Sequence, residues 1–216
     1  MREKIYLDID VSSAKETIAA LRKVYTEAEL RRMVYSAFKR TAQYTRTAVK
    51  RILPQEYHVT QKVVGKHIGQ PVIKMGGIGL GVSCVIPIKG KRLSIGGSFK
   101  ARGGMPGWSA VRAGKRYKIT AKIVRDGNST MPGTMEHQGG YPPFINTVAP
   151  KLHNAAFTRT GRKTKNGKDA IAKVVGIAVP QMPMNRSKEE VEDAVAKKLI
   201  ERLEHEHAWR VQQCQR

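Results

Sequence analysis

The residues whose types are best suited to bind a metal or do chemistry are a histidine and glutamate cluster near the end of the chain. Residues 204–207 read EHEH, and imidazole with carboxylate is a donor set that zinc accepts. The segment has helical periodicity, however, and helix positions two apart point in different directions. Because the two imidazoles cannot share an ion without bending the helix, we interpret the cluster as a solvated helix end.

Acidic residues for a nuclease are also sparse. Two-metal hydrolysis needs several carboxylates that converge on divalent ions. The candidates stand singly among cations in turn or loop segments: Asp126, Glu136 and Asp169. The remaining histidines are scattered along the chain: His58, His67, His137 and His153. We therefore predict a protein without catalysis, metal or cofactor.

Two glycine-rich stretches superficially resemble phosphate-binding loops. They read GGIGLG at 76–81 and GKRLSIGG at 90–97. A P-loop lies between a strand and a helix and ends in lysine followed by serine or threonine. Neither stretch has this order, so we interpret these glycines as turn or bulge residues.

Positive charge is the strongest chemical property of the sequence. The chain has 40 Lys and Arg against 17 Asp and Glu, a net charge of +23. From Tyr57 to Arg125 there is no acidic residue, but there are fourteen Lys or Arg. Unopposed like charges destabilise a compact state, so we expect this segment to meet nucleic-acid phosphate or a carboxylate-rich protein. A merely solvated basic surface is the alternative interpretation.

The sequence offers no motif for reading a nucleic-acid sequence. Zinc-finger spacing, a ribonucleoprotein motif and a persuasive helix-turn-helix are all missing from it. Single-strand binders interleave aromatic and basic residues, whereas Trp108, Tyr117 and Tyr141 are too sparse for a stacking platform. Nonspecific attraction to the phosphate backbone is the form of binding that stays open.

Periodicity predicts the elements of the N-terminal part. Apolar residues alternate over 5–11, which predicts a half-buried first strand. Ser13–Glu16 and Thr26–Glu29 both match a capping box, so helices should begin near 14 and 27. The second helix should end at Pro54. Its buried stripe is predicted to contain Leu30, Val34, Ala37, Phe38, Ala42 (or Thr41), Thr45, Ala48, Val49 and Ile52.

The middle of the chain has the texture of strands and turns. VSCVIPI at 82–88 and LSIGGSF at 93–99 flank a glycine turn and predict a hairpin. Residues 126–143 form a long polar connection. Connections of this length in compact domains are usually functional, so we expect a functional loop or an assembly arm there.

The last third predicts a second hairpin and a helix. Two β-rich runs flank an Asn-Gly turn at 166–167, and we expect Ile171, Val174 and Val175 to face a core. Ser187–Glu190 is a third capping box. The final amphipathic helix should pack through Val191, Val195, Leu199 and Leu203.

The cysteines and the hydropathy of the sequence indicate in which kind of cellular compartment the protein is expected. Cys84 and Cys214 are not spaced as metal ligands, and a disulfide framework needs more cysteines, so a reducing environment is expected. The N-terminus has no apolar signal region, and no window approaches eighteen consecutive apolar residues. We therefore expect neither a signal peptide nor a membrane span.

The block AAFTRTGRKTKNGKDAIAKVVGIAVPQM, residues 155–182, resembles the characteristic block of the tailed-phage minor tail protein Z family of prophage tail-completion proteins. In that family an AF strand leads through a basic hairpin to an ending of the form I…GxxVPQM. The matching residues are Ala156, Phe157, Ile171, Gly176, Val179, Pro180, Gln181 and Met182. A long amphipathic helix follows, and the N-terminal helix pair also fits the family.

The resemblance implies a structural virion protein that completes the head-proximal end of the tail and takes part in head-tail joining. It implies a homo-oligomeric ring around the tail axis, such as a hexamer, with tail terminator, tail tube or head-connector proteins as neighbours. Nonspecific contact with phage DNA is compatible with this role. The expected location is the virion tail or neck, after assembly in the host cytoplasm, with no membrane partner. No active-site residues carry over.

Together these observations predict an α+β fold with an N-terminal strand and helices, a mostly antiparallel sheet with extended loops, and a C-terminal amphipathic helix. A single domain is expected over 1–216, with extended arms at about 65–107 and 126–143. The alternative function is nonspecific nucleic-acid binding. The candidate partner- or DNA-facing residues are Lys115, Arg116, Lys118, Arg162, Lys163, Lys165 and Lys168.

Overall fold

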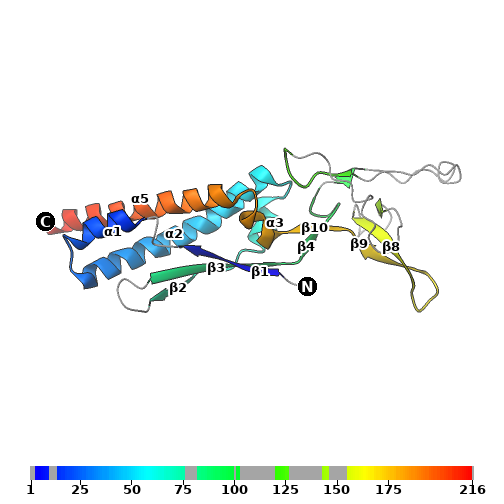
Figure 1. The fold of residues 1–216 in the computed structure, drawn as a ribbon, viewed down its shortest axis with the longest axis horizontal. Helices are drawn as coiled ribbons and strands as arrows, with labels where there is room; N and C mark the ends of the chain where they lie inside the picture. Colours follow the sequence, from blue (N-terminus) through cyan, green and yellow to red (C-terminus); the bar gives the residue numbers. More distant parts are fainter. Residues whose placement is uncertain are drawn as a thin grey trace. The chain divides into compact units, whose positions relative to one another are not determined.

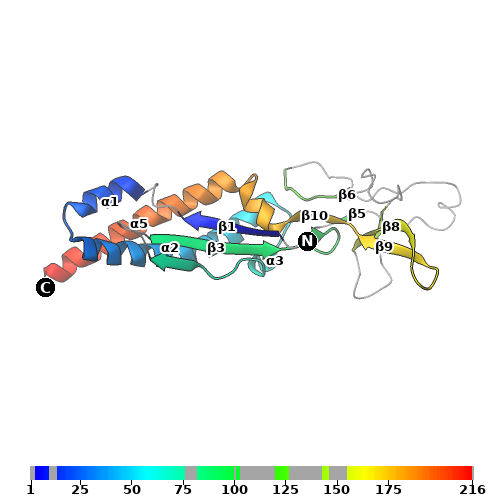
Figure 2. The same ribbon diagram turned by 60° about the horizontal axis from the view of Figure 1, so that its bottom comes forward.

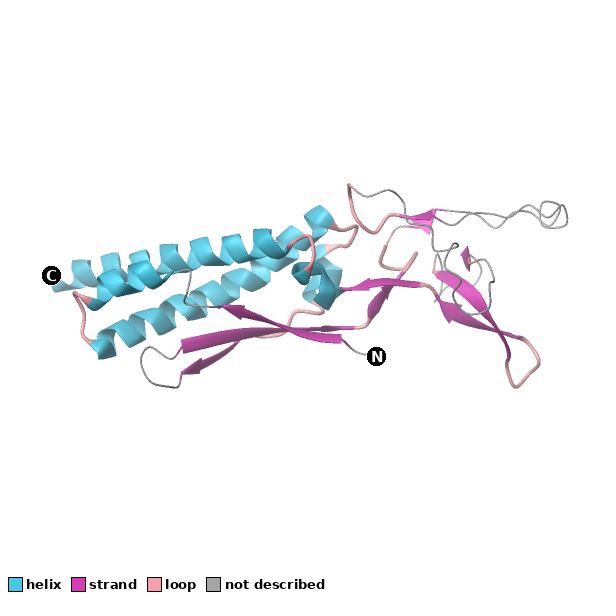
Figure 3. Cartoon of the chain, in the orientation of Figure 1, coloured by secondary structure: helices cyan, strands magenta, loops and turns pink. Residues whose placement is uncertain are grey.

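The chain folds as helices and antiparallel strands, as Figures 1 and 3 show, and it has the predicted α+β class. A computed structural model describes residues 3–9, 14–75, 82–99, 101–102, 120–126, 143–145 and 155–215. Two compact units share the chain, and each is built from separate segments. Unit 1 comprises Met1–Leu53, Val64–Gly90 and Pro180–Arg216, and unit 2 comprises Pro54–Val63 and Lys91–Val179. The single domain over 1–216 stays a prediction.

Unit 1 contains a three-stranded antiparallel sheet in the order β1-β3-β2. Its strands are β1 (Glu3–Ile9), β2 (Val72–Met75) and β3 (Val82–Gly90). Alternate residues of a strand point to opposite faces, and Ile9, Cys84, Ile86 and Ile88 are all buried on one face. Figure 2 shows this sheet lying in front of the helices of the same unit. The predicted first strand is thereby confirmed.

The partner of β3 differs from the prediction. Residues 82–88 do not form a hairpin with 93–99, because β3 pairs with β1 from Glu3 opposite Gly90 to Ile9 opposite Cys84, and its first residues pair with β2. The strand β4 (Arg92–Ser94) pairs instead with β10 (Val175–Ala178). The predicted arm at about 65–107 therefore contains the central strand of the sheet, since the apolar side chains of β3 need a covered face.

The long helix α2 (Glu27–Glu56) has the predicted buried stripe. Every residue expected there is buried, together with Met33 and Leu53. The predicted capping box also forms, because the Glu29 amide donates to the Thr26 hydroxyl oxygen at 3.4 Å, and the Thr26 amide and hydroxyl donate to Glu29 Oε2 at 3.0 and 2.7 Å. The two hydrogen bonds that the carboxylate accepts lower the pKa of the Glu29 carboxyl. The helix runs two residues past Pro54, so the prediction that it ends at Pro54 is wrong.

Two further helices complete unit 1: α1 (Lys15–Arg22) and α5 (Lys188–Cys214). Val191, Leu199 and Leu203 are buried along α5 as predicted, and Val195 is half-buried. The capping box at Ser187 is absent, however, and its buried hydroxyl lacks a hydrogen-bond partner within the described part of the chain. The backbone of Ser187, with ψ of 7°, lies outside the β-region geometry typical of an N-cap residue.

Helix α5 lies antiparallel to α2, as Figure 1 shows. The Ser36 hydroxyl donates to Glu206 Oε1 at 2.7 Å, and Lys198 Nζ lies 5.4 Å from the centre of the Tyr44 ring. The second contact is eight residues later on α2 and eight residues earlier on α5. This equal spacing in opposite directions fixes one register for the pair.

Glu206 corrects the interpretation of EHEH as a solvated helix end. Its side chain is buried, and Arg40 Nε lies 3.8 Å from the carboxylate that Ser36 also contacts. The next residue, His207, is hydrogen-bonded through Nδ1 to the Tyr25 hydroxyl at 2.8 Å. Glu206 falls three residues after Leu203 on the same helix face, so the packing of that face carries the carboxylate against α2.

Unit 2 is built from short strands around a small apolar core. The pairs are β4 with β10, β5 (Ala101–Arg102) with β6 (Thr120–Ala121), and β7 (Phe144–Ile145) with β8 (Ala156–Lys163), which also pairs with β9 (Asp169–Lys173). Buried residues include Leu93, Ile95, Phe99, Ala121 and Ile145. The short helix α3 (Gln61–Gly65) and the 3-10 helix η4 (Val179–Met184) lie where the chain passes from one unit to the other. The predicted arm at 126–143 lies almost entirely outside the described residues.

Replacing Phe38 with alanine should destabilise the protein by about 3–5 kcal/mol, because its fully buried ring fills the core stripe of α2. The free energy of unfolding from denaturant titration measures the effect. Lys39→Ala on the exposed side of the same turn is the control, with an expected change within about 0.5 kcal/mol. Equal losses in both variants would contradict the assigned helix phase.

Candidate functional site

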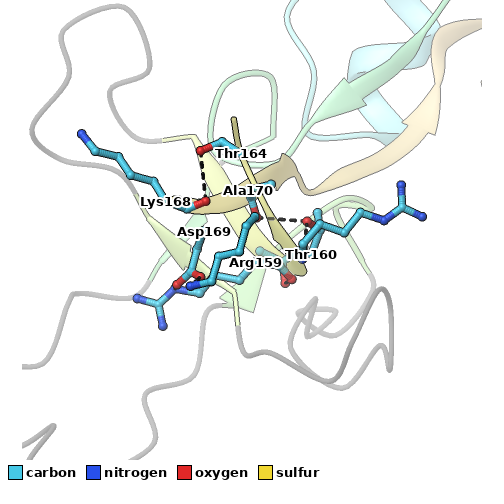
Figure 4. Close-up of polar contacts among 9 residues, drawn as sticks. Arg159, Thr160, Thr164, Lys168, Asp169 and Ala170 are labelled. Carbon is cyan, nitrogen blue, oxygen red and sulfur yellow. Dashed lines mark hydrogen bonds and ion pairs between the residues drawn. The ribbon is translucent and has the colours of Figure 1, made fainter. Parts of the chain in front are cut away.

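The block 155–182 folds as a β-hairpin followed by β10 and η4. We call residues 156–173, comprising β8, the turn and β9, the basic hairpin; Figure 4 shows its polar contacts. The two strands are antiparallel, with Phe157 opposite Lys173 and Lys163 opposite Asp169. The predicted hairpin is therefore confirmed.

A register shift divides the basic hairpin between Arg159 and Lys163. Gly161 lies within the shift with φ of 73°, a left-handed conformation that glycine adopts without steric cost. The Thr160 hydroxyl donates to the Ala170 carbonyl at 3.1 Å across the shift (Figure 4). A side chain thus satisfies a backbone group where the regular ladder is interrupted.

Hydrogen bonds between Thr164 and Lys168 close the turn at the tip of the basic hairpin. The Thr164 amide and hydroxyl both donate to the Lys168 carbonyl, at 2.8 and 3.1 Å, and the hydroxyl contact is drawn in Figure 4. Gly167 also has a left-handed φ of 73°, and its amide donates to the Thr164 carbonyl at 2.9 Å. These bonds order a tip whose side chains have no core to pack against.

The base of the basic hairpin is anchored in unit 2. Ala156 and Phe157 are buried, and the Phe157 ring lies 6.1 Å from that of Phe144 on the neighbouring strand. The backbone of Ile95 bonds to both Ala156 and Val174. These contacts hold the start of β8 and the end of β9 in the core.

Close packing explains why glycine stands at position 176, within the block 155–182. A Cβ at this position would come within 3.0 Å of Phe99 and 3.2 Å of Ile123. Val179 and Met182, later in the same block, are fully buried, as is Pro180, whereas Gln181 is half-buried. The block therefore ends in structural rather than exposed positions.

Ile171 and Val175 do not face a core, which corrects the prediction for β9. Ile171 is 47% exposed and Val175 is 40% exposed, while Val174 is half-buried. Ile171 pairs with the exposed Arg159, so it lies past the buried base on the edge strand of its sheet.

Cationic side chains cover the rest of the basic hairpin. Arg162, Lys163, Lys165 and Lys168 are all exposed, and that they face a partner or DNA stays a prediction. Residues 156–173 carry six cationic side chains and one acid, Asp169. The remaining candidates, Lys115, Arg116 and Lys118, lie outside the described residues.

Asp169 balances only part of this charge. Lys163 Nζ donates to its carboxylate at 2.7 Å, and Arg159 Nε lies 3.7 Å away. The hydrogen bond from Lys163, followed by the charges of Lys163 and Arg159, lowers the pKa of the Asp169 carboxyl. Among the described residues, no side-chain ion pair involves Arg162, Lys165 or Lys168, so these three leave their positive charge on the exposed surface of the hairpin.

No group of three or more His, Cys, Asp or Glu that could hold a metal ion occurs within the described ranges. Asp126 is exposed, Asp169 is paired in the basic hairpin, and Glu136 lies outside those ranges. Among the described helices, none is long and apolar enough to cross a membrane.

No protein-family model matches this chain, and neither does any curated protein or solved structure.

Phe157→Ala should cost about 3 kcal/mol of folding free energy, because the ring is only 4% exposed at the anchored base. Ile171→Ala in the same hairpin is the matched control and should cost much less, since its side chain is half in solvent. Denaturant titration of both variants measures the difference. A larger loss for Ile171 would contradict the strand phase described above.

Lys163→Met should raise the pKa of the Asp169 carboxyl, because the variant removes the hydrogen bond and the nearest positive charge. Carboxyl NMR titration measures this pKa. In the wild-type chain the lowered pKa means that the pair contributes stability above the ordinary carboxyl range and loses it as the pH falls through the folded value. An unchanged pKa in the variant would show that the pair does not persist in solution.

Proposed function

We propose that this chain is a structural virion protein of a tailed phage, which completes the head-proximal end of the tail and takes part in head-tail joining without catalysis. One observation carries the proposal. Within the block that resembles tail-completion proteins, the basic hairpin combines a buried base with an exposed cationic tip, and Gly176 after it makes a packing contact that only glycine fits. Such an element presents charge to a partner at a defined position.

The energetics of the basic hairpin favour assembly as its purpose. Its tip is ordered by backbone and threonine hydrogen bonds, although exposed lysines there repel one another. An acidic neighbour in a ring, a connector or a tail tube would relieve this repulsion. Electrostatic complementarity of this kind gives rate and specificity to association.

Nonspecific nucleic-acid binding is the second candidate function, supported by the net charge of +23. A chain with this excess attracts any phosphate backbone through counterion release. In a tail neck the two functions are compatible, since a basic protein beside the DNA path would contact both proteins and DNA.

The test removes the charge of the hairpin. Arg162, Lys163, Lys165 and Lys168 are changed together to alanine, and completed virions and unjoined heads and tails are counted by electron microscopy. We expect the association constant with the neighbouring protein to fall about tenfold for each 1.4 kcal/mol lost, and the count of completed particles to fall with it. The reason is that the tip then offers no counter-charge to an acidic neighbour.

The control changes four exposed cations of unit 1 by the same total charge: Lys15, Lys23, Arg186 and Lys197, each to alanine. It should leave particle completion near the wild-type level. Normal virion yield from the hairpin variant, together with sequence-selective DNA binding by the wild-type chain, would defeat the structural role and favour a regulator.

A further inference from the structure

The open face of the three-stranded sheet in unit 1 combines positive charge with exposed apolar surface. The sheet buries its other face through Cys84, Ile86 and Ile88. By register, the open face contains Lys4 and Tyr6 of β1, Val72 and Lys74 of β2, and Val85, Pro87 and Lys89 of β3. Tyr6 is 47% and Val72 48% exposed, and all three lysines are exposed.

Two of these lysines are direct cross-strand neighbours. Lys4 is opposite Lys89 in the antiparallel ladder, and Cβ atoms in such pairs are only about 4.5–5.5 Å apart. Like charges directly opposite each other destabilise a sheet. Lys4 Nζ lies 4.5 Å from the centre of the Tyr6 ring, which keeps the ammonium over the open face.

The backbone at Lys89 is held firmly, so this pair cannot relax by local movement of the strand. The Lys89 amide donates to the His67 carbonyl at 2.9 Å, and His67 Nδ1 is hydrogen-bonded to the Lys89 carbonyl at 2.9 Å. The adjacent Gly90 is packed so closely that a Cβ there would lie 2.6 Å from His67 Nδ1. The sheet therefore maintains two neighbouring cations on rigid structure.

By register this face carries three lysines and one acidic position, although β1 also contains Glu3 next to Lys4 in the sequence. Among the residues whose side chains the structure describes, no ion pair involves Lys4, Lys74 or Lys89. Asp8, opposite Val85, is the acidic residue whose register position falls on this face. Between Leu30 and Gly90 the sequence contains one acid, Glu56. The three lysines thus leave an excess of positive charge on the face.

The charge of the whole chain indicates which kind of anionic partner this face would bind. A second copy brings the same excess of +23, so self-association would add repulsion, whereas double-stranded DNA carries one negative charge per about 1.7 Å of its axis. Lys74 is opposite Ser83, six residues along β3 from Lys89, which is about 20 Å in an antiparallel strand. A duplex backbone supplies several phosphates over that length.

We propose that the open face of the β1-β3-β2 sheet binds the sugar-phosphate backbone of double-stranded DNA, with Lys4, Lys74 and Lys89 as phosphate contacts. The inference deepens the nucleic-acid part of the proposed function and rests on it. It assigns the contact to a surface of unit 1 that is separate from the basic hairpin. Sequence selectivity is not expected, because lysine contacts to phosphates carry no base information.

The salt dependence of DNA affinity tests this assignment. A labelled duplex of arbitrary sequence is titrated with the full-length chain between about 50 and 200 mM salt, and log Kobs is plotted against log salt concentration. Each lost phosphate contact lowers the magnitude of the slope by about 0.9, so the variant Lys4→Gln, Lys74→Gln, Lys89→Gln should lower it by about 2.7. The control variant Lys15→Gln, Lys23→Gln, Lys197→Gln removes equal charge from exposed positions in α1, just after α1 and in α5, and should leave the slope close to wild type.

Equal slope changes in the two variants would overturn the proposal, because they would indicate diffuse attraction to the whole chain. An unchanged slope in the sheet variant, with loss of binding to polyglutamate, would overturn it in favour of an acidic protein ligand. No DNA binding by the wild-type chain would refute the sheet assignment and the nucleic-acid function together. The virion role would still be decided separately by particle counts.

The single variant Lys4→Glu provides a check that does not depend on a loss of folding. It replaces a like-charge pair by an opposite-charge pair across the ladder. We expect a higher Tm than wild type together with weaker DNA binding. A lower Tm with unchanged DNA affinity would show that the lysine pair serves the fold and not a ligand.

Discussion

Scarcity of negative charge is the constraint on which the rest of this structure depends. Seventeen acidic side chains face forty basic ones, and several of the acids have defined structural tasks. Glu29 caps α2, Glu206 joins α5 to α2, and Asp169 holds the two strands of the basic hairpin together. Where acids are spent on internal contacts, the excess of cations is left on the surface.

Burial of apolar surface has to offset the resulting repulsion. In unit 1 this task falls on α2, whose stripe is buried over nearly the whole helix. The small residues Ala37, Ala42 and Ala48 in that stripe permit close approach of neighbouring elements. In unit 2 the core is smaller, and it relies on close fits at single positions, such as the space beside Phe99 that admits only glycine at 176.

Local patterns predicted the helices well because their information is local. The α2 stripe and the Thr26 capping box follow from residues within one or two turns of each other. The partner of β3 could not be predicted in this way, since the choice between β1 and β4 depends on residues some eighty positions away in sequence. Ser187 shows the limit even of local rules, because its sequence matches a cap motif while its backbone conformation leaves the cap unformed.

The candidate site was predictable to the same extent. Exposure of Arg162, Lys165 and Lys168 follows from the Asn-Gly turn, but the exposure of Ile171 follows from its pairing with Arg159 past the buried base. Glu206 had a usable signal that was missed, namely its position three residues after Leu203 on the packed face. The like-charge pair of Lys4 and Lys89 depends on strand register, so only the fold reveals it.

The register shift at Gly161 has a consequence for how this protein can change over evolutionary time. On one side of the shift the hairpin is fixed by buried side chains, and on the other it is fixed by its own turn and the exposed Lys163–Asp169 ion pair. The tip can therefore gain, lose or exchange residues without repacking the core. Lineages that meet a new neighbour would be able to remodel this one loop while inheriting the scaffold intact.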